Sequence, residues 1–242
     1  MSPPVNHWPR RIERARVLET EYPAAAELLH FYREIAAFQK QVAQAFLPVS
    51  FLPVSCSSLP EPLRPYIEPL LELLQRVAPP ELAAAATGPW PLDPGPQSFV
   101  TQVLVQPYAE SLARRAPAAP SSTRSACPFC NELPVAAILR PEGEGGKRSL
   151  LCSLCFTEWE FRRLLCPRCG EEDHQKLPVY TAEQFPHIRI EACDSCRTYV
   201  KSIDLTRNGL AVPEVDEIAA LPLDLWAAGH DYSKLQPNLF RV

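Results

Sequence analysis

The sequence predicts an α+β protein made of a helical N-terminal domain, two tandem β modules and a C-terminal segment that packs on the rest. Three observations predict this architecture. Apolar residues recur at helical spacing in the first half of the chain, eight of the nine cysteines fall in four Cys-x-x-Cys pairs, and the cysteine-rich stretch repeats internally. The predicted boundaries are 1–120 for the helical domain, 121–163 and 164–205 for the two modules, and 206–242 for the C-terminal segment.

Three main helices are expected in the N-terminal domain, at 24–46, 63–77 and 99–115. In the first of them, spacings of three and four residues place one set of apolar side chains on a single face. That set is Leu28, Phe31, Ile35, Phe38, Val42 and Phe46. Pro107 is expected to disturb the third helix, and a short alanine-rich helix is expected at 80–87.

Proline-rich segments are expected to separate the helices and the domains. The five residues FLPVS occur twice in tandem at 46–55, where the prolines forbid a continuous helix, so we expect an extended connection. The duplication itself suggests no function. The composition changes sharply at 117–125, and the domain boundary is placed there.

The four Cys-x-x-Cys pairs are typical of metal-binding knuckles. The two-residue gap lets two thiolates point at one cation, while the intervening backbone N–H groups turn toward the sulfurs. Eight thiolates are enough for two tetrahedral sites with four cysteine ligands each. The predicted ligands are Cys127, Cys130, Cys152 and Cys155 for the first site, and Cys166, Cys169, Cys193 and Cys196 for the second.

The internal repeat favours this sequential pairing of knuckles. A Cys-Pro-x-Cys knuckle, a Leu-Pro-Val, a charged stretch and a second knuckle occur in this order twice. Each unit then resembles a rubredoxin or a zinc ribbon, with an ion held between two hairpin tips. Asn131 and Gly170, after the first knuckles, tolerate the left-handed turn that such a tip needs, whereas Phe156 and Arg197, after the second knuckles, fit it less well. Interlaced pairing, first with third and second with fourth, is the main alternative.

Fully ligated cysteine sites favour a structural role over catalysis, because no position stays open for a substrate or an activated water. His174 and His187 lie between knuckles and could in principle replace a cysteine, while Cys56 is interpreted as a small buried or half-buried thiol. Five acidic residues at 158–173 are interpreted as a solvated face. The sequence contains no recognisable arrangement of catalytic residues, so we do not expect an enzyme.

Composition and charge narrow the class of partner. Between Cys127 and Lys201 there are 10 Lys and Arg against 11 Asp and Glu, so the metal region lacks the basic stripe of a nucleic-acid-binding ribbon. No apolar run is long enough to span a membrane, and no apolar segment follows the arginines at 10–11 as a secretory signal would require. We therefore expect a cytoplasmic protein with neither nucleic acid nor membrane as partner. In that compartment clustered cysteines are metal ligands rather than disulfides.

The helical N-terminal domain, the knuckles CPFC, CSLC, CPRC and CDSC, and the closing segment LPLDLWAAGHDYSKLQPNLF together resemble the formate dehydrogenase accessory protein FdhE family. The resemblance implies a cytoplasmic maturation factor. Its expected partner is the catalytic subunit of a selenium- and molybdenum-containing formate dehydrogenase, before or during export. The resemblance also implies iron in rubredoxin-like sites, with zinc as the alternative that sulfur ligands equally accept. Homodimerisation is left open.

Two other functions remain as alternatives. In a rubredoxin-like electron carrier or thiol redox protein, aromatic residues near the knuckles, namely Phe129, Phe156 and Trp159, would tune solvent access to the metal. A zinc-ribbon adaptor for nucleic acid is the other, and the acidic charge balance disfavours it.

Overall fold

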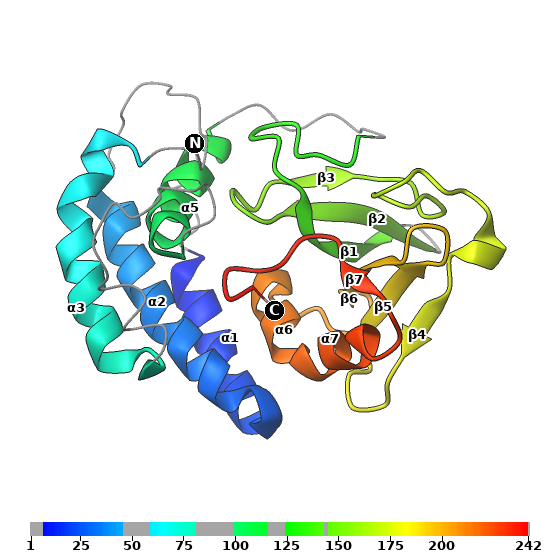
Figure 1. Ribbon diagram of the computed structural model, residues 1–242, viewed down its shortest axis with the longest axis horizontal. Coiled ribbons are helices and arrows are strands. Elements are labelled where there is room, and N and C mark those ends of the chain that lie inside the picture. The colour runs from blue at the N-terminus through cyan, green and yellow to red at the C-terminus, as the bar shows by residue number, and fades with distance from the viewer. Residues whose placement is uncertain (1–6, 46–58, 81–98, 116–123, 143–144, 242) are drawn as a thin grey trace.

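The computed structural model describes residues 7–45, 59–80, 99–115, 124–142 and 145–241. A helical region precedes a region built on one β-sheet, which confirms the predicted fold class (Figure 1). The duplicated FLPVS segment, Cys56 and nearly all of the alanine-rich helix expected at 80–87 lie outside the described residues. None of the described helices is long and apolar enough to cross a membrane.

Three of the main helices of the first region lie within the predicted segments, and a fourth, α1 (Trp8–Glu21), precedes them and was not predicted. The other three are α2 (Ala26–Ala45), α3 (Ile67–Val77) and α5 (Phe99–Ala113). Short 3-10 turns at Pro23–Ala25 and Glu61–Tyr66 lead into α2 and α3, because the prolines there suit a first turn and not a helix interior.

Helix α2 is buried on two faces, one more than its apolar periodicity suggested. Phe31, Ile35, Phe38 and Val42 lie in a large core shared with α3 and α5, as their spacing predicts. The neighbouring Leu29, Tyr32 and Ala36 lie in a second core shared with α1 and with α6 (Pro213–Ala219). The helix therefore joins the N-terminal region to the C-terminal segment.

Pro107 does not interrupt α5, contrary to expectation. A proline at this position cannot donate to the carbonyl of Val103, one turn earlier. The side chain of Gln39 on α2 supplies the missing donor, with its Nε2 3.0 Å from that oxygen. Gln39 also donates to Gln106, which in turn donates to the backbone oxygen of Ser153 at 3.1 Å. Side-chain amides thus compensate for the proline and connect α2, through α5, to the loop between Cys152 and Cys155.

Replacing Gln39 by leucine is expected to destabilise the protein by about 1–3 kcal/mol, because the buried Val103 carbonyl would lose its donor. Urea unfolding followed by circular dichroism measures this change. Gln44→Leu is the matched control, because Gln44 is exposed on the same helix. Equal unfolding midpoints for the two variants would contradict the compensation of Pro107 by Gln39.

One sheet spans both cysteine-containing repeats. Its strands are β1 (Pro134–Glu142), β2 (Gly145–Cys152), β3 (Glu158–Glu160), β4 (Val179–Thr181), β5 (Ile188–Cys193), β6 (Thr198–Asp204) and β7 (Ser233–Lys234). The order is β3-β2-β1-β6-β5-β4, with β7 beside β6, and β1 and β6 join the two repeats by parallel pairing. Each repeat thus contributes an antiparallel three-stranded half, and the modules are fused edge to edge.

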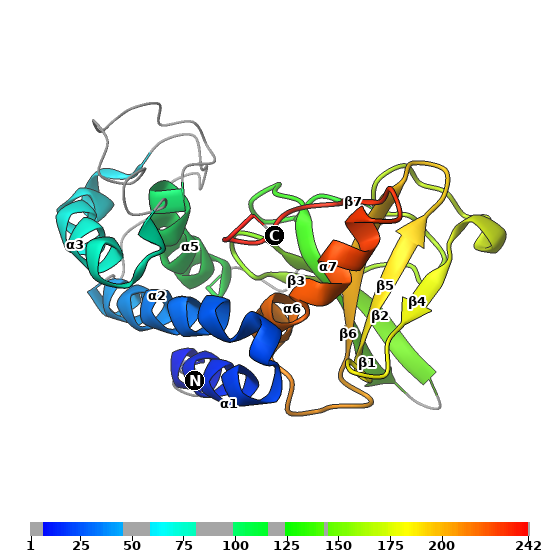
Figure 2. The same cartoon turned by 60° about the horizontal axis from the view of Figure 1, so that its bottom comes forward.

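Helices α6 and α7 (Leu221–Ala228) lie against one face of the sheet (Figure 2). Four buried charges lie at this contact. Lys201 of β6 bonds Asp224 of α7 at 2.5 Å and Glu217 of α6 at 2.9 Å, and Lys234 of β7 pairs with both carboxylates. Because the two lysines balance the two carboxylates, the cluster is neutral overall, as a buried charge cluster must be.

Glu217 makes stability depend on pH below about 4.5. Burial alone would raise its pKa, but Lys201 and Lys234 outweigh burial and lower the pKa to about 2. A lowered carboxylate pKa stabilises the fold above its unfolded value and ceases to do so as pH falls through the folded value. The free energy of unfolding should therefore fall between about pH 4.5 and pH 2 more steeply in the wild type than in Glu217→Gln. Urea midpoints at several acidic pH values measure the difference between the two proteins, which cancels any acid effect on the cysteine sites. Parallel pH profiles would show that Glu217 is not responsible.

Candidate metal centres

The structure brings the eight cysteines together in two groups of four. Within each group the sulfur atoms all lie within 4.8 Å of one another. Site 1 is Cys127, Cys130, Cys152 and Cys155, and site 2 is Cys166, Cys169, Cys193 and Cys196. These are the groups that sequential pairing of the knuckles predicts. That they bind metal ions remains a prediction.

The spacing of the sulfurs suits a tetrahedral ion. A metal–sulfur bond of about 2.3 Å places sulfurs at tetrahedral corners about 3.8 Å apart. In site 1 the sulfur of Cys130 lies 3.3 Å from that of Cys152 and 3.5 Å from that of Cys155. In site 2 the sulfurs of Cys166 and Cys196 are 3.7 Å apart. All eight thiols are free of disulfide bonds, so the donor set fits iron or zinc with four thiolates at each site.

Three knuckles share one backbone hydrogen bond. The residue after the second cysteine donates its N–H to the carbonyl of the first, from Asn131 to Cys127, from Gly170 to Cys166 and from Arg197 to Cys193. Backbone N–H groups also reach the sulfurs, for example from Arg168 to Cys166 at 3.3 Å. Such bonds stabilise thiolates and set the orientation of the ligands.

All four residues that follow a knuckle adopt the left-handed conformation. Their φ angles are 66° at Asn131, 52° at Phe156, 77° at Gly170 and 55° at Arg197. Phe156 and Arg197, which were expected to fit this turn less well, thus adopt the same backbone conformation as Asn131 and Gly170. Both side chains make contacts that compensate for the strain, since Phe156 lies under the guanidinium of Arg11 and Arg197 bonds Asp194.

Gly170→Ala is expected to cost about 1–2 kcal/mol, the strain of a left-handed residue with a Cβ. A Cβ at this position would meet no atom within 4 Å, so crowding adds nothing to the cost. Thermal melting and the rate at which a chelator removes metal from site 2 measure the effect. Gly209→Ala is the control, because Gly209 has an ordinary φ. Identical behaviour of the two variants would contradict the strain argument.

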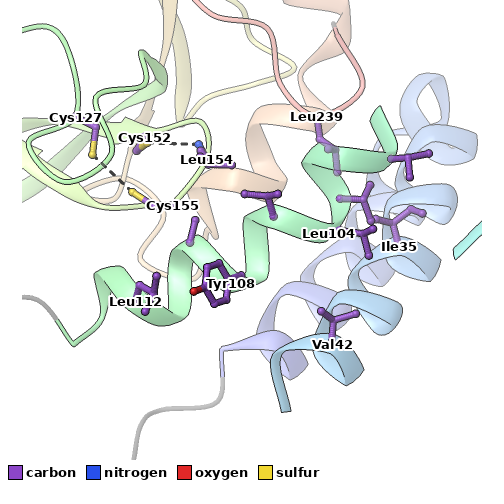
Figure 3. Packing of buried hydrophobic residues seen from close by; sticks show 14 of the residues in the cluster. Ile35, Val42, Leu104, Tyr108, Leu112, Cys127, Cys152, Leu154, Cys155 and Leu239 are labelled. Carbon is purple, nitrogen blue, oxygen red and sulfur yellow. Dashed lines mark hydrogen bonds between the residues drawn. The ribbon is translucent and has the colours of Figure 1, made fainter. Parts of the chain in front are cut away.

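Site 1 is part of the main hydrophobic core. Cys127, Cys152 and Cys155 are each at most 2% exposed and share a core with α5, which runs beside the cluster and contributes Tyr108 and Leu112 to that core (Figure 3). Site 2 is more open, because Cys169 is exposed and Cys196 half-buried. The two repeats therefore place chemically similar sites in different surroundings.

Burial makes metal binding compete with protons. In site 2 burial raises the pKa of the Cys193 thiol to about 12, so at neutral pH the free thiol keeps its proton. A cation must displace that proton to bind the thiolate. Metal binding at such a site is coupled to proton release and weakens as pH falls.

A buried ion-pair cluster that the sequence analysis missed fixes site 1 to the helices. Arg11 of α1 bonds Glu110 of α5 through two nitrogens, each 2.8 Å from an oxygen, and bonds Glu214 of α6 at 2.5 Å. Its guanidinium lies between the rings of Trp8 and Phe156, 4.8 and 4.5 Å from their centroids. Phe156 directly follows Cys155, so this stack connects site 1 to the N-terminal helix.

One sequence signal could have identified Arg11. The buried positions of α1 are Trp8, Arg11, Ala15 and Leu18, so the arginine occupies a slot in the apolar 3.6-residue period. An arginine at a core position requires a buried carboxylate. Glu110 lies at such a position in α5, whose hydrophobic periodicity is weak because almost every side chain is buried.

The C-terminal segment holds the second knuckle of site 2. Arg197 lies over the ring of Tyr232 at 3.9 Å, and its side chain donates to the backbone oxygens of His230 and Asp231. The Tyr232 hydroxyl donates to Asp194, inside the knuckle, at 2.5 Å. This segment therefore has a structural role at the more open site.

Neither histidine that could replace a cysteine joins a cluster. His174 is exposed, and His187 bonds Asp216 at 2.8 Å in a buried pair. Glu158 and Glu160, expected on a solvated acidic face, pair with Arg140 and Lys147. The aromatic Trp159 is buried, while Phe129 and Phe156 are partly exposed.

Two family models match the sheet region. The model described as FdhE, central domain, matches residues 126–163, and the model described as FdhE, C-terminal domain, matches residues 164–241. The first match contains site 1 and the second contains site 2. The boundary between the two models, after residue 163, thus lies between the two sites.

Curated relatives and a solved structure agree with these matches. The chain is 38% identical over 113 residues to the "Protein FdhE homolog" of Aquifex aeolicus and 35% identical over 124 residues to that of Pseudomonas aeruginosa. These alignments cover 46% and 49% of this chain and 40% of each relative, so the chain matches less than half the length of either. The crystal structure of the FdhE protein from Pseudomonas aeruginosa shares the fold, with a TM-score of 0.78 over 100% of this chain and 98% of that one at 22% identity.

The region that matches the family models in sequence is the sheet with its two four-cysteine sites, together with the segment that follows the sheet. Residues 126–241 thus match the central and C-terminal domains of the FdhE family.

Proposed function

We propose that this protein is a non-enzymatic accessory factor that binds the catalytic subunit of a (seleno)molybdenum formate dehydrogenase before that subunit is exported and assembled. The match of residues 126–241 to the FdhE family models, with all four knuckles intact, carries this proposal. The binding event takes place in the cytoplasm. The two sites hold metal ions, with iron favoured over zinc by the family resemblance.

The closed coordination of both sites supports a role other than catalysis. Four cysteine sulfurs surround each position, and no histidine or carboxylate belongs to either cluster among the described residues. A tetrahedral site whose ligands are all protein atoms offers no position to a substrate. The sites thus act as structural or redox-sensing elements that shape a surface for another protein.

The exposure of Cys169 favours a second candidate function, rubredoxin-like electron transfer or thiol redox chemistry. A one-electron iron couple would require a thiolate ligand that solvent or a partner can approach, and site 2 provides one. Metal analysis and the absorption spectrum of anaerobically purified protein separate the candidates. Ferric thiolate colour that bleaches reversibly would favour the redox function, and two zinc ions in a colourless protein would exclude it.

The main test is a binding measurement between the full chain and a purified formate dehydrogenase catalytic subunit. We expect a saturable complex that survives gel filtration at moderate salt. A Cys166→Ser, Cys169→Ser variant should lose one metal ion per chain and bind the subunit more weakly. Absence of binding by the metal-loaded wild type would overturn the proposal, and wild-type metal content in the variant would overturn the ligand assignment.

A further inference from the structure

A groove of about 270 Å³ lies beside site 2. Its lining includes Glu191 of β5 and Val200 of β6, which pair on one sheet face, and the two ligands Cys166 and Cys193. The opposite sheet face is covered by α7 through Ile190 and Tyr199. Val200, on the groove side, belongs to the main core that includes the helices. Strands β4 and β5 lie on the side of the sheet that is far from the helical region (Figure 1).

Two large apolar side chains stand exposed at the groove. Leu164 is 58% exposed and Val179 52% exposed, and both line it. Only a few large apolar side chains among the described residues are as exposed, so two of them at one groove mark a surface that another apolar group would cover.

The backbone of β4 at this groove is available for pairing. β4 is the last strand of the sheet, and within the described residues no strand lies on its outer side. Ala192 donates to the carbonyl of Pro178, which fixes Pro178 and Tyr180 as the positions that bond β5. The peptide groups of Val179 and Thr181 therefore face outward. An extended segment of another chain could add to this edge.

The groove carries surplus positive charge at one end. Arg148, Arg163 and Arg189 line it against a single carboxylate, Glu191, which both Arg148 and Arg189 bond. Arg163 has no carboxylate partner among the described residues, and its side chain reaches only the backbone oxygen of Gly146. The arginines could thus bind one or more further acidic groups.

This positive end is separate from the thiolates of site 2. Arg189 and Cys193 lie four residues apart on β5, about 13 Å at 3.3 Å per residue. Gly146, which Arg163 touches, lies still further along the sheet, because it pairs with Pro141 near the distal end of β1. A distance of that size exceeds the screening length of about 8–10 Å at physiological salt. At Arg189 the negative charge of a four-thiolate site is therefore largely screened.

We infer that the groove binds an extended segment of a partner protein in which an aliphatic residue and an aspartate or glutamate lie two positions apart. The register of β4 and β5 sets this spacing. Val179 pairs with Glu191 and Thr181 with Arg189, so a strand added to β4 would place side chains at positions i and i+2 beside Val179 and beside Thr181, in the row that continues to Arg189 on β5. The aliphatic side chain covers Leu164 and Val179, and the acid meets Arg189 and, once its side chain leaves the Gly146 oxygen, the exposed Arg163.

The partner is the formate dehydrogenase catalytic subunit, so this part of the inference rests on the proposed function. Its test compares affinities of that subunit for surface variants of the full chain. Leu164→Asp and Arg163→Glu should each raise the dissociation constant about tenfold or more, as expected for residues at the centre of an interface. Leu225→Asp and Arg115→Glu are matched controls, because Leu225 is 67% exposed on α7 and Arg115 is exposed after α5. We expect wild-type affinity for both controls.

A second measurement tests the recognition chemistry without the subunit. Two dye-labelled nonapeptides differ only at one position, with Leu-Ser-Asp at the centre of one and Leu-Ser-Lys at the centre of the other. Anisotropy should show tighter binding of the aspartate peptide by about tenfold, and Arg163→Glu should abolish the preference.

The two measurements separate failure of the inference from failure of the proposed function. If the subunit binds and the Leu164 and Arg163 variants bind it like the wild type, the groove is not the docking surface, while the proposed function stands. If the subunit does not bind but the aspartate peptide does so through Arg163, the groove recognises this chemistry in another partner and the proposed function fails. Equal binding of the two peptides overturns the charge requirement.

Discussion

Replacing Cys152 by serine is expected to unfold much of the protein, whereas replacing Cys169 by serine is expected to remove one metal ion and leave the rest folded. Cys152 is fully buried in the main core, which also contains α2, α3 and α5. Structural zinc contributes about 10–16 kcal/mol to folding in small peptides, which is as large as the total stability of an ordinary domain. Loss of site 1 would also leave three thiols without a cation, and two of them, Cys127 and Cys155, are buried.

Site 2 should respond less to the same chemical change. Cys169 is exposed, so the serine hydroxyl that replaces its thiol can be solvated. The surrounding strands keep their own core of Phe185, Ile188, Ile190 and Tyr199 against α7. We therefore expect Cys169→Ser to melt cooperatively at a lower temperature, and Cys152→Ser to lose cooperative melting.

Metal content per chain and far-UV circular dichroism melting check both expectations on proteins purified in parallel. Binding of a hydrophobic dye distinguishes a molten core from a folded one. Cooperative melting of Cys152→Ser near the wild-type temperature would show that site 1 does not hold the core. Collapse of Cys169→Ser would show that the open site matters as much as the buried one.

The cysteine pattern made both sites accessible to prediction because the ligands are local in sequence. A two-residue gap places paired sulfurs by backbone geometry alone, and the repeat of the unit leaves sequential pairing as the simplest solution. Main helices were similarly predictable, since Ile35 and Val42 lie on the face that their spacing indicates. Resemblance to the FdhE family rested on the same knuckles, and the family models match there.

Features that depend on distant segments escaped prediction. Continuity of the sheet needs β1 and β6 to pair in parallel across about 65 residues of chain, and nothing in either strand alone requires this. The course of α5 through Pro107 depends on Gln39, which lies 64 residues before the carbonyl it bonds. The groove beside site 2 likewise forms only when the 163–167 segment folds over β5. Such long-range compensation overrides local propensity.

Replacing Arg11 by methionine is expected to destabilise the protein by about 3–5 kcal/mol, because Glu110 and Glu214 would lose their shared buried counter-charge. The change acts on three helices and on site 1 together, since the guanidinium also packs on Phe156. Burial alone would raise the pKa of Glu110, but Arg11 outweighs burial and holds it well below the usual range. Without Arg11 this buried carboxylate would keep only the partly exposed Arg114 and His7 as partners.

Arg16→Met provides the matched control. Arg16 lies on the same helix and pairs with Glu13, but both side chains are 60% exposed, and such pairs contribute at most about 0.5 kcal/mol. Urea unfolding at pH 7 should therefore separate the two variants clearly. A double variant, Arg11→Met with Glu110→Met, should recover part of the loss, because it removes a buried charge instead of leaving one unpaired.

The metal site gives this prediction a second readout. If the Arg11 stack holds the loop after Cys155, a chelator should remove metal from site 1 faster in Arg11→Met than in Arg16→Met, at a urea concentration where both remain folded. If the two variants release metal at equal rates but differ in free energy of unfolding, Arg11 stabilises the helices and not site 1. Equal stability of the two variants would mean that Arg114 and His7, which also contact Glu110, balance its charge without Arg11.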